Sequence, residues 1–482
     1  MRAHETSYFN DLRIPTVAPT RKENLEVNPS RTISRRSALI WMLIATAISV
    51  AWGYSIEASD AEGLVDFRAI YFGARAALDH QNPYHPSEFL QVYTAEGGTF
   101  PSDRVQKGLF LRSVPICVNL PTTLFLVAPF ALLPWGASHA LWLILTGAGF
   151  TLAAFLAWDL AREHAPRVSL FLICIMSANS EVLFTLGNTA GIAVSLAVVA
   201  VWCFFRERLI WAGILCLAIS LALKPHDSGL VWLYLLVMGG AIRKRALYTA
   251  MVTVLLAVPA VIWISNVAPN WDRDLGANLA ATSAHGDISD PGPDSISRAG
   301  SADIIVDLQT VVSVFRDEPV FYNPAVWGIC GGLMALLIVK AMRSQPSPGN
   351  AWYALAAVAP LTMVITYHRP YDAKLLLLAI PACALLWAEG RRTGRIALLV
   401  TGLAITFTSD IPLGIMSFVS GRFNLSEMNA GARLLSIFVV RPTPLILLAM
   451  AMFYLWMCFA RPGRKVAARK LAHCDEIEIA HA

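Results

Sequence analysis

The chain has 482 residues, of which 56% are hydrophobic and only 15% charged, and its formal net charge is +5. A soluble domain carries about a quarter charged residues, so this composition excludes an ordinary soluble protein. About a dozen apolar runs approach the roughly 20 residues that cross a bilayer, and they are long blocks, unlike the short alternating strands of a membrane β-barrel. The sequence therefore predicts an all-α polytopic integral membrane protein.

The first apolar run follows a polar tail. Residues 1–36 end in a basic cluster, and excess Lys and Arg beside a first span, at about 37–56, marks the cytoplasmic side. Ser34-Arg35-Arg36 also resembles a twin-arginine export signal, but the row of further spans favours a retained anchor. We predict a cytoplasmic tail at 1–36, a transmembrane domain at 37–460 and a second cytoplasmic tail at 461–482.

Further apolar segments lie at about 117–134, 138–158, 168–186, 188–205, 209–223, 229–242, 246–266, 326–342, 350–367, 373–388, 395–412 and 441–460. With the first they make an odd number, whereas basic residues place both termini in the cytoplasm, which requires an even number. Either the proline-rich 117–134 run does not cross, or the short pair flanking Lys224 is not two spans. We predict about twelve spans, with outer loops at about 57–115 and 267–323.

The first outer loop begins with a helical pattern. From Asp66 to His80 apolar residues form one stripe, and Arg68 and Arg75 share a face because they are two turns apart. This pattern predicts an interfacial helix with its apolar side toward lipid or protein, followed by a loop with a second short helix. In the second outer loop, residues 287–303 are rich in Asp, Ser, Gly and Pro, and residues 304–315 are apolar enough for another interfacial helix.

The polar groups that stand out near the predicted outer face are one acid followed by mostly basic residues: Asp66, Arg68, Arg75, Lys224, His226, His368, Arg369, Asp372 and Lys374. A carboxylate among cations suits transfer from a phosphate leaving group. The carboxylate accepts the proton of an acceptor hydroxyl, and the cations stabilise the departing phosphate. The sequence has no glycine-rich nucleotide-binding motif, which disfavours an ATP-driven pump or a nucleotide-sugar enzyme.

Each of these residues also has a structural interpretation. Asp66 is a good N-cap for a helix that starts at Phe67, which is compatible with catalysis. The two arginines of this helix can equally snorkel to the interface. Lys224 can pair with Asp227, and Asp372 with Lys374. The histidine and arginine that precede Asp372 can also be ordinary polar residues at a helix end.

Three short stretches resemble a known family. A span followed by Asp-Phe-Arg-x-x-Tyr-x-x-Ala-Arg-Ala, from Asp66, and ending in Asn-Pro-Tyr-x-Pro resembles glycosyltransferase family 87, which includes mycobacterial polyprenol-phosphate-mannose-dependent mannosyltransferases. Lys224-Pro225 after a span, and the stretch from His368 to Asp372, are also similar to that family. The resemblance implies a GT-C type helical bundle, a sugar donor carried on a polyprenyl phosphate, an acid in the first outer loop as base, and inversion at the anomeric carbon. Asp66 matches that acid by position.

We therefore predict a membrane glycosyltransferase that moves a hexose such as mannose from a polyprenyl-phosphate donor to a lipid or glycan acceptor. It would work on the outer face of a bacterial cytoplasmic membrane, with Asp66 as general base and the other residues named above binding substrate. Its partners would be this donor, the acceptor and membrane lipids, with no nucleic acid, and we expect no cofactor and no metal. The alternatives are a transporter or flippase of lipid-linked saccharide and a glycan polymerase or ligase, although a transporter would often show internal repeats.

Overall fold

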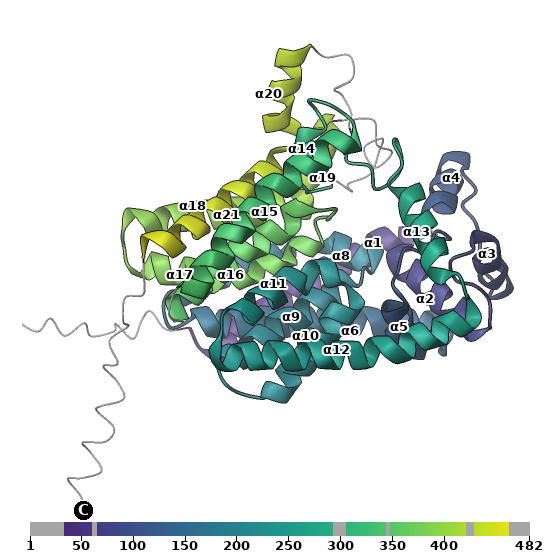
Figure 1. The fold of residues 1–482 in the computed structure, drawn as a ribbon, viewed down its shortest axis with the longest axis horizontal. Helices are drawn as coiled ribbons and strands as arrows, with labels where there is room; N and C mark the ends of the chain where they lie inside the picture. The colour runs from purple at the N-terminus through teal and green to yellow at the C-terminus, as the bar shows by residue number, and fades with distance from the viewer. Residues whose placement is uncertain (1–32, 60–64, 293–304, 344–347, 421–428, 462–482) are drawn as a thin grey trace, which may run out of the picture. The chain divides into compact units, whose positions relative to one another are not determined.

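The computed structural model describes residues 33–59, 65–292, 305–343, 348–420 and 429–461, all within a compact unit that begins at Ile33. Every regular element in these ranges is a helix, which confirms the predicted all-α class (Figure 1). Most of the predicted tails at 1–36 and 461–482 and most of 287–303 fall outside the described residues.

Five described helices are long and apolar enough to cross a membrane: α1 (Arg35–Ser59), α6 (Trp135–Ala161), α12 (Gly240–Val267), α15 (Pro319–Arg343) and α21 (Pro442–Ala460). A sixth crossing would combine α18 (Arg392–Phe407) with α19 (Asp410–Ser420), which bend by 66° at a short break. Large apolar side chains on these helices are exposed, including Trp41, Leu255 and Trp327, as lipid-facing residues would be. A helical membrane protein is thereby supported, whereas twelve spans remain a prediction.

The other apolar segments form shorter helices, several of them interrupted: α5 (Pro121–Ala131), α7 (Pro166–Ala178), α8 (Glu181–Leu186), α9 (Ala190–Phe205), α10 (Ile210–Leu223), α11 (Pro225–Val237), α16 (Pro348–Ile365), η3 (Asp372–Ala379) and α17 (Ile380–Ala388). The predicted 168–186 segment is divided at Asn179 and Ser180. The 117–134 segment gives a helix of only 11 residues, about half the length that a span needs at roughly 1.5 Å per residue.

The helix predicted from Asp66 is α2 (Val65–Leu78), and two short helices follow it, α3 (Pro86–Ala95) and α4 (Arg104–Ser113), where one was predicted. The apolar face of α2 packs into a small aromatic core of its own with α5, α6 and α13 (Trp271–Thr282). Phe67 stacks on Trp142 of α6 with ring centroids 4.4 Å apart. This protein-facing packing holds the start of α2 against α6.

The turn at Asn82–Pro86 joins the two predicted outer loops. Asn82 accepts a hydrogen bond from the Tyr84 N–H at 2.9 Å and donates to Asp274 of α13 at 3.0 Å. Asn278, one turn further along α13, donates to the Tyr84 carbonyl at 3.0 Å. The Asn-Pro-Tyr stretch therefore fixes the first loop to α13, a helix that the sequence analysis did not predict.

The helix predicted at 304–315 is wrong for most of its length, because only α14 (Gln309–Val312) is helical in the described part. The Val306 N–H donates to the His368 carbonyl at 2.9 Å, and the Leu308 N–H donates to the Val364 carbonyl at 3.0 Å. These backbone groups bind the last turn of α16 and the chain after it instead of forming a helix of their own. The second predicted outer loop is thereby held beside His368.

A larger apolar core lies among the remaining helices. Within it α9 packs between α6 and α10, and α16 packs against α21 and η3. In Figure 1, α2, α3, α4 and α13 gather at one end of the described bundle, away from α17, α18 and α21. A further helix, α20 (Ala430–Val440), precedes α21. The interrupted helices α8, α10 and η3 all end or begin next to the first outer loop or the chain that follows α16.

Candidate active site

The break between α10 and α11 places Lys224. A residue before proline avoids the helical conformation, and Lys224, which precedes Pro225, has φ −152° and ψ 80°. Thr122 and Thr123 of α5 donate to the last two carbonyls of α10, at 2.6 and 2.8 Å. Because these carbonyls have no partner within the helix, the threonine hydroxyls replace the hydrogen bonds lost at the break. The Lys224 side chain at this break lies in the interior of the protein.

A second break places Asn188. Gly187 ends α8 with φ 63° and ψ 32°, a left-handed conformation that glycine adopts without strain. Its carbonyl accepts a hydrogen bond from the Trp142 indole at 2.8 Å, and the Asn188 side chain accepts one from the Ala190 N–H at 2.9 Å. The same Trp142 stacks on Phe67, so one indole ties this break to the start of α2.

Side-chain hydrogen bonds link Asp66, Asn188, Lys224 and Asp372 in a chain. Asn188 donates from Nδ2 to Oδ2 of Asp66 at 2.8 Å and accepts at Oδ1 from Nζ of Lys224 at 3.1 Å. The Lys224 ammonium also donates to Oδ1 of Asp372. The structure thus brings together three predicted site residues that lie far apart in the sequence.

Asp227 and His368 extend this chain. Both side chains are fully buried, and His368 Nε2 lies 3.3 Å from Asp227 Oδ1. His226, at the more exposed edge, has its ring 5.0 Å from that of His368. Burial opposes a charge on His368, but the neighbouring carboxylates of Asp227 and Asp372 outweigh burial and raise the pKa of His368 above its ordinary value.

Arg369 connects the cluster to the second predicted outer loop. Its backbone N–H donates to Oδ2 of Asp372 at 2.8 Å. Its guanidinium donates to the Tyr367 hydroxyl and, at 3.3 Å, to the Ile288 carbonyl. Tyr371 lies beneath the Lys224 ammonium, 4.9 Å from ring centroid to Nζ. Cations and carboxylates therefore alternate through a buried cluster, where electrostatic interactions are stronger than in water.

Arg68 and Arg75 do not pair with Asp66. Arg68 donates to the Tyr93 hydroxyl at 3.3 Å, and Arg75 pairs with Glu96 at 2.8 Å. Their described contacts hold α2 against α3 and the residues after it. Asp66 instead accepts a hydrogen bond from Asn188, whose side-chain oxygen accepts one from Lys224.

Lys374 lies apart from the cluster as well. Its ammonium donates to the Asn179 carbonyl at 3.4 Å and faces the carboxyl groups of Glu181 and Asp410. The interpretation that Asp372 and Lys374 pair with each other is wrong, because the 3-10 turn of η3 sends their side chains to different sides.

The structure also corrects the capping interpretation. Because α2 begins at Val65, Asp66 is inside the first turn and is not the N-cap, although an acid there still interacts favourably with the helix start. Asn188 and Asp227 were not among the predicted site residues. Both had a signal in the sequence, since each lies in a short polar interruption between apolar runs, where a buried polar group needs a partner.

Two groups of described side chains could hold a metal ion, since their ligand atoms lie within 4.8 Å of one another: His226, Asp227 and His368, and His285, Asp290 and Asp317. In the first group the Lys224 ammonium is 3.6 Å from Asp227 and already supplies a positive charge. In the second group, the Asp290 carboxylate accepts hydrogen bonds from the backbone N–H groups of Gly286 and Gly292 and so stabilises the loop that contains it.

The described helices and the buried polar chain between them define a helical membrane protein with a polar site at its helix breaks. The family model described as glycosyltransferase family 87 matches residues 119–366, just over half of the chain. The chain therefore belongs to glycosyltransferase family 87 and is a glycosyltransferase. The match includes Asn188, Lys224 and Asp227, whereas Asp66 and Asp372 lie outside it. No curated protein and no solved structure matches the chain.

Proposed function

We propose that this glycosyltransferase moves a hexose such as mannose from a polyprenyl-phosphate carrier to a hydroxyl group of a lipid or glycan acceptor. Family membership supports sugar transfer, and the hydrogen-bonded chain from Asp66 through Asn188 and Lys224 to Asp372 is the observation that supports this site. It holds a carboxylate and an ammonium on opposite sides of one amide group. A base and a cation at a fixed separation are what transfer from a phosphate leaving group needs.

In this mechanism the Asp66 carboxylate takes the proton of the acceptor hydroxyl as its oxygen attacks the anomeric carbon. The bond between that carbon and the phosphate oxygen breaks, and the polyprenyl phosphate leaves with the bonding electron pair. Attack opposite the leaving group inverts the anomeric carbon. Lys224 and Arg369, with protonated His368, would stabilise the negative charge on the phosphate, and His226 would line the more exposed edge of its site.

We further propose a GT-C type arrangement with twelve crossings. The shortness of α5 supports this count, because omitting the 117–134 segment leaves an even number of apolar segments and places both termini in the cytoplasm. The helix breaks at Asn188, Lys224 and His368 then open on the outer face of a bacterial cytoplasmic membrane. The basic residues at the other helix ends, such as Arg243 and Arg343, face the cytoplasm.

Single cysteines would test this orientation. His80 and Ser283 are exposed in the first and second outer loops, and Arg343 is exposed at the end of α15. In a Cys474→Ser background, His80→Cys and Ser283→Cys should react with an impermeant maleimide in whole cells, and Arg343→Cys only after the membrane is permeabilised. The opposite pattern would reverse the proposed orientation.

The raised pKa of His368 predicts an alkaline limb in the rate profile. A raised pKa keeps the imidazolium charged above the ordinary value of about 6.5, and the charge is lost as pH rises through the pKa of the folded protein. If this charge stabilises the leaving phosphate, kcat/KM should fall over that interval in the wild type and should lack this limb in His368→Gln. An identical alkaline limb in both proteins would remove His368 from the phosphate site.

The donor class can be tested directly with purified protein. We expect the enzyme to use a polyprenyl monophosphate hexose, to release polyprenyl monophosphate and to form an inverted glycosidic bond, detected by mass spectrometry and by the anomeric coupling of the product. A polyprenyl diphosphate oligosaccharide should not react. Transfer of whole oligosaccharides from the diphosphate carrier would instead identify a glycan polymerase or ligase.

A further inference from the structure

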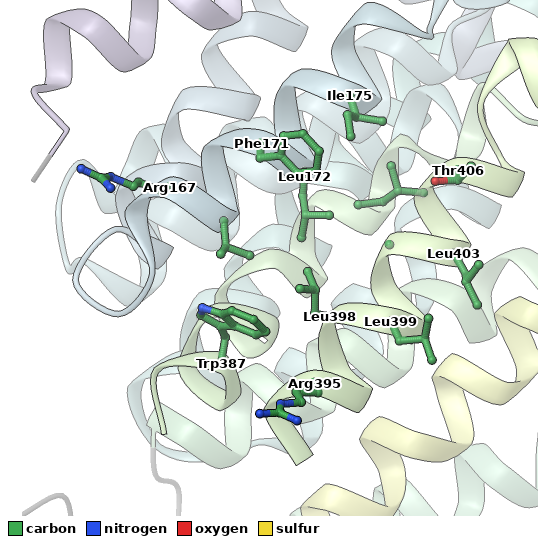
Figure 2. Close-up of a pocket in the computed structure, with 13 residues that line it drawn as sticks. Arg167, Phe171, Leu172, Ile175, Trp387, Arg395, Leu398, Leu399, Leu403 and Thr406 are labelled. Atoms are coloured by element: carbon green, nitrogen blue, oxygen red, sulfur yellow. The ribbon is translucent and has the colours of Figure 1, made fainter. Parts of the chain in front are cut away.

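An apolar groove of about 690 Å³ lies between α7, α17 and α18, outside the polar site (Figure 2). Most of its lining is aliphatic or aromatic: Phe171, Leu172, Ile175, Leu398, Leu399 and Leu403. Phe171 is 63% exposed and Leu399 59% exposed, so the groove is open to the surroundings of the helix bundle. In a membrane protein, such a surface faces lipid chains.

One end of the groove is cationic. Arg167 is in the first turn of α7 and Arg395 in the first turn of α18, and in Figure 2 they lie at separate borders of the groove, Arg395 beside Trp387, whereas Ile175 and Thr406 lie toward the other end. No lining residue is acidic. Among the described residues, Arg395 has no ion pair. A second hollow of about 520 Å³ shares Arg395 and adds Arg392 to the same end.

This cationic end is remote from the proposed active site. The 13 residues of α7, about 20 Å of helix at roughly 1.5 Å per residue, separate Arg167 from the break that leads to Asn188. Likewise η3 begins at Asp372, and the chain runs through all of α17 before it reaches Arg395. A donor phosphate at the Asp66 site therefore cannot also occupy this end of the groove.

We propose that the groove binds an anionic phospholipid of the cytoplasmic leaflet, with its acyl chains along α7 and α18 and its headgroup at the end of the groove that carries Arg167 and Arg395. The long apolar lining of the groove complements the acyl chains of a lipid. The two basic side chains at one end complement its phosphate headgroup. The absence of an acidic residue from the lining favours a net negative headgroup over a zwitterionic one. Only the choice of leaflet rests on the orientation proposed above.

The test compares two lipids on the delipidated full-length protein in detergent, by native mass spectrometry. Phosphatidylglycerol should bind more tightly than phosphatidylcholine with the same chains. The variant Arg167→Gln/Arg395→Gln should lose roughly 25-fold in affinity for phosphatidylglycerol, at about fivefold for each basic residue. A matched control, Lys244→Gln/Arg343→Gln, removes two exposed basic residues elsewhere on the proposed cytoplasmic side and should bind as the wild type does.

A second variant tests the apolar part. A side chain added at Gly402 would meet Leu172 at an ordinary contact distance of 3.9 Å, so Gly402→Leu should fold, which thermal unfolding would check. By occupying the groove it should weaken the binding of both lipids. Equal affinity for the two lipids, or an unchanged affinity in Arg167→Gln/Arg395→Gln, would overturn the proposal. So would displacement of bound phosphatidylglycerol by polyprenyl phosphate at equal concentration, which would make the groove a donor site. None of these outcomes depends on sugar transfer.

Discussion

The variant Asp66→Asn should fold and bind the donor but transfer sugar roughly 10²–10⁴-fold more slowly than the wild type, because general base catalysis typically contributes that much. Asparagine keeps the size of the side chain, and its amide oxygen can still accept the hydrogen bond from Asn188 that the Asp66 carboxylate accepts at 2.8 Å. What it loses is the ability to take a proton from the acceptor hydroxyl. Single-turnover transfer measured with bound donor isolates this step from donor binding.

A matched control lies on the same helix. Asp79, at the other end of α2, is exposed and pairs with Arg75 at 3.3 Å. Asp79→Asn makes the same chemical change away from the cluster and should leave transfer nearly unchanged. Asp79→Asn should shift stability by at most about 1 kcal/mol, since a surface ion pair is worth no more, and Asp66→Asn by at most about 2 kcal/mol, as for a partly buried acid in the first turn of a helix. Near-normal transfer by a folded Asp66→Asn protein would leave the proposed mechanism without its base.

The helical class and the first loop could be predicted because they depend on local patterns. Long apolar blocks specify helices in lipid, and the apolar stripe from Phe67 specifies α2 within one or two residues. Pro225 likewise predicts a break after Lys224, because the residue before proline avoids the helical conformation whatever its surroundings.

The partners within the site could not be predicted, because they depend on which helix breaks meet in space. Arg68 and Arg75 share a face with each other, but the fold turns that face toward Tyr93 and Glu96. Asn188 follows a glycine that ends a six-residue helix, and nothing in its own stretch of sequence indicates Asp66, more than a hundred residues earlier, as its partner. Apolar periodicity also cannot distinguish the 305–308 stretch from a helix, since the partners of its Val306 and Leu308 N–H groups come from another part of the chain.

Burial changes what is expected of Lys224. The sequence alone predicts that its removal lowers activity without unfolding the protein. In the structure the Lys224 ammonium lies between the buried carboxylates of Asp227 and Asp372. Removing one partner of a buried ion pair leaves an uncompensated charge, which typically costs about 3–5 kcal/mol. Lys224→Met should therefore lower both the thermal stability and the rate of transfer, so a single substitution cannot separate the two roles of this residue.

The double variant Lys224→Met/Asp372→Asn separates them. Asparagine at 372 removes the excess charge and retains an oxygen that can accept the Arg369 N–H, which the Asp372 carboxylate accepts at 2.8 Å. Relative to Lys224→Met, the double variant should regain stability, with a coupling of about 0.5–3 kcal/mol between the two positions, as for residues in contact.

If Lys224 stabilises the leaving phosphate, transfer should stay low although the fold recovers, since the ammonium is still absent. Thermal unfolding and kcat/KM measured on both variants and on Asp372→Asn alone complete the cycle. Recovery of transfer together with stability would show that Lys224 only balances the charge of Asp372, and the phosphate would then have to be held by Arg369 and His368.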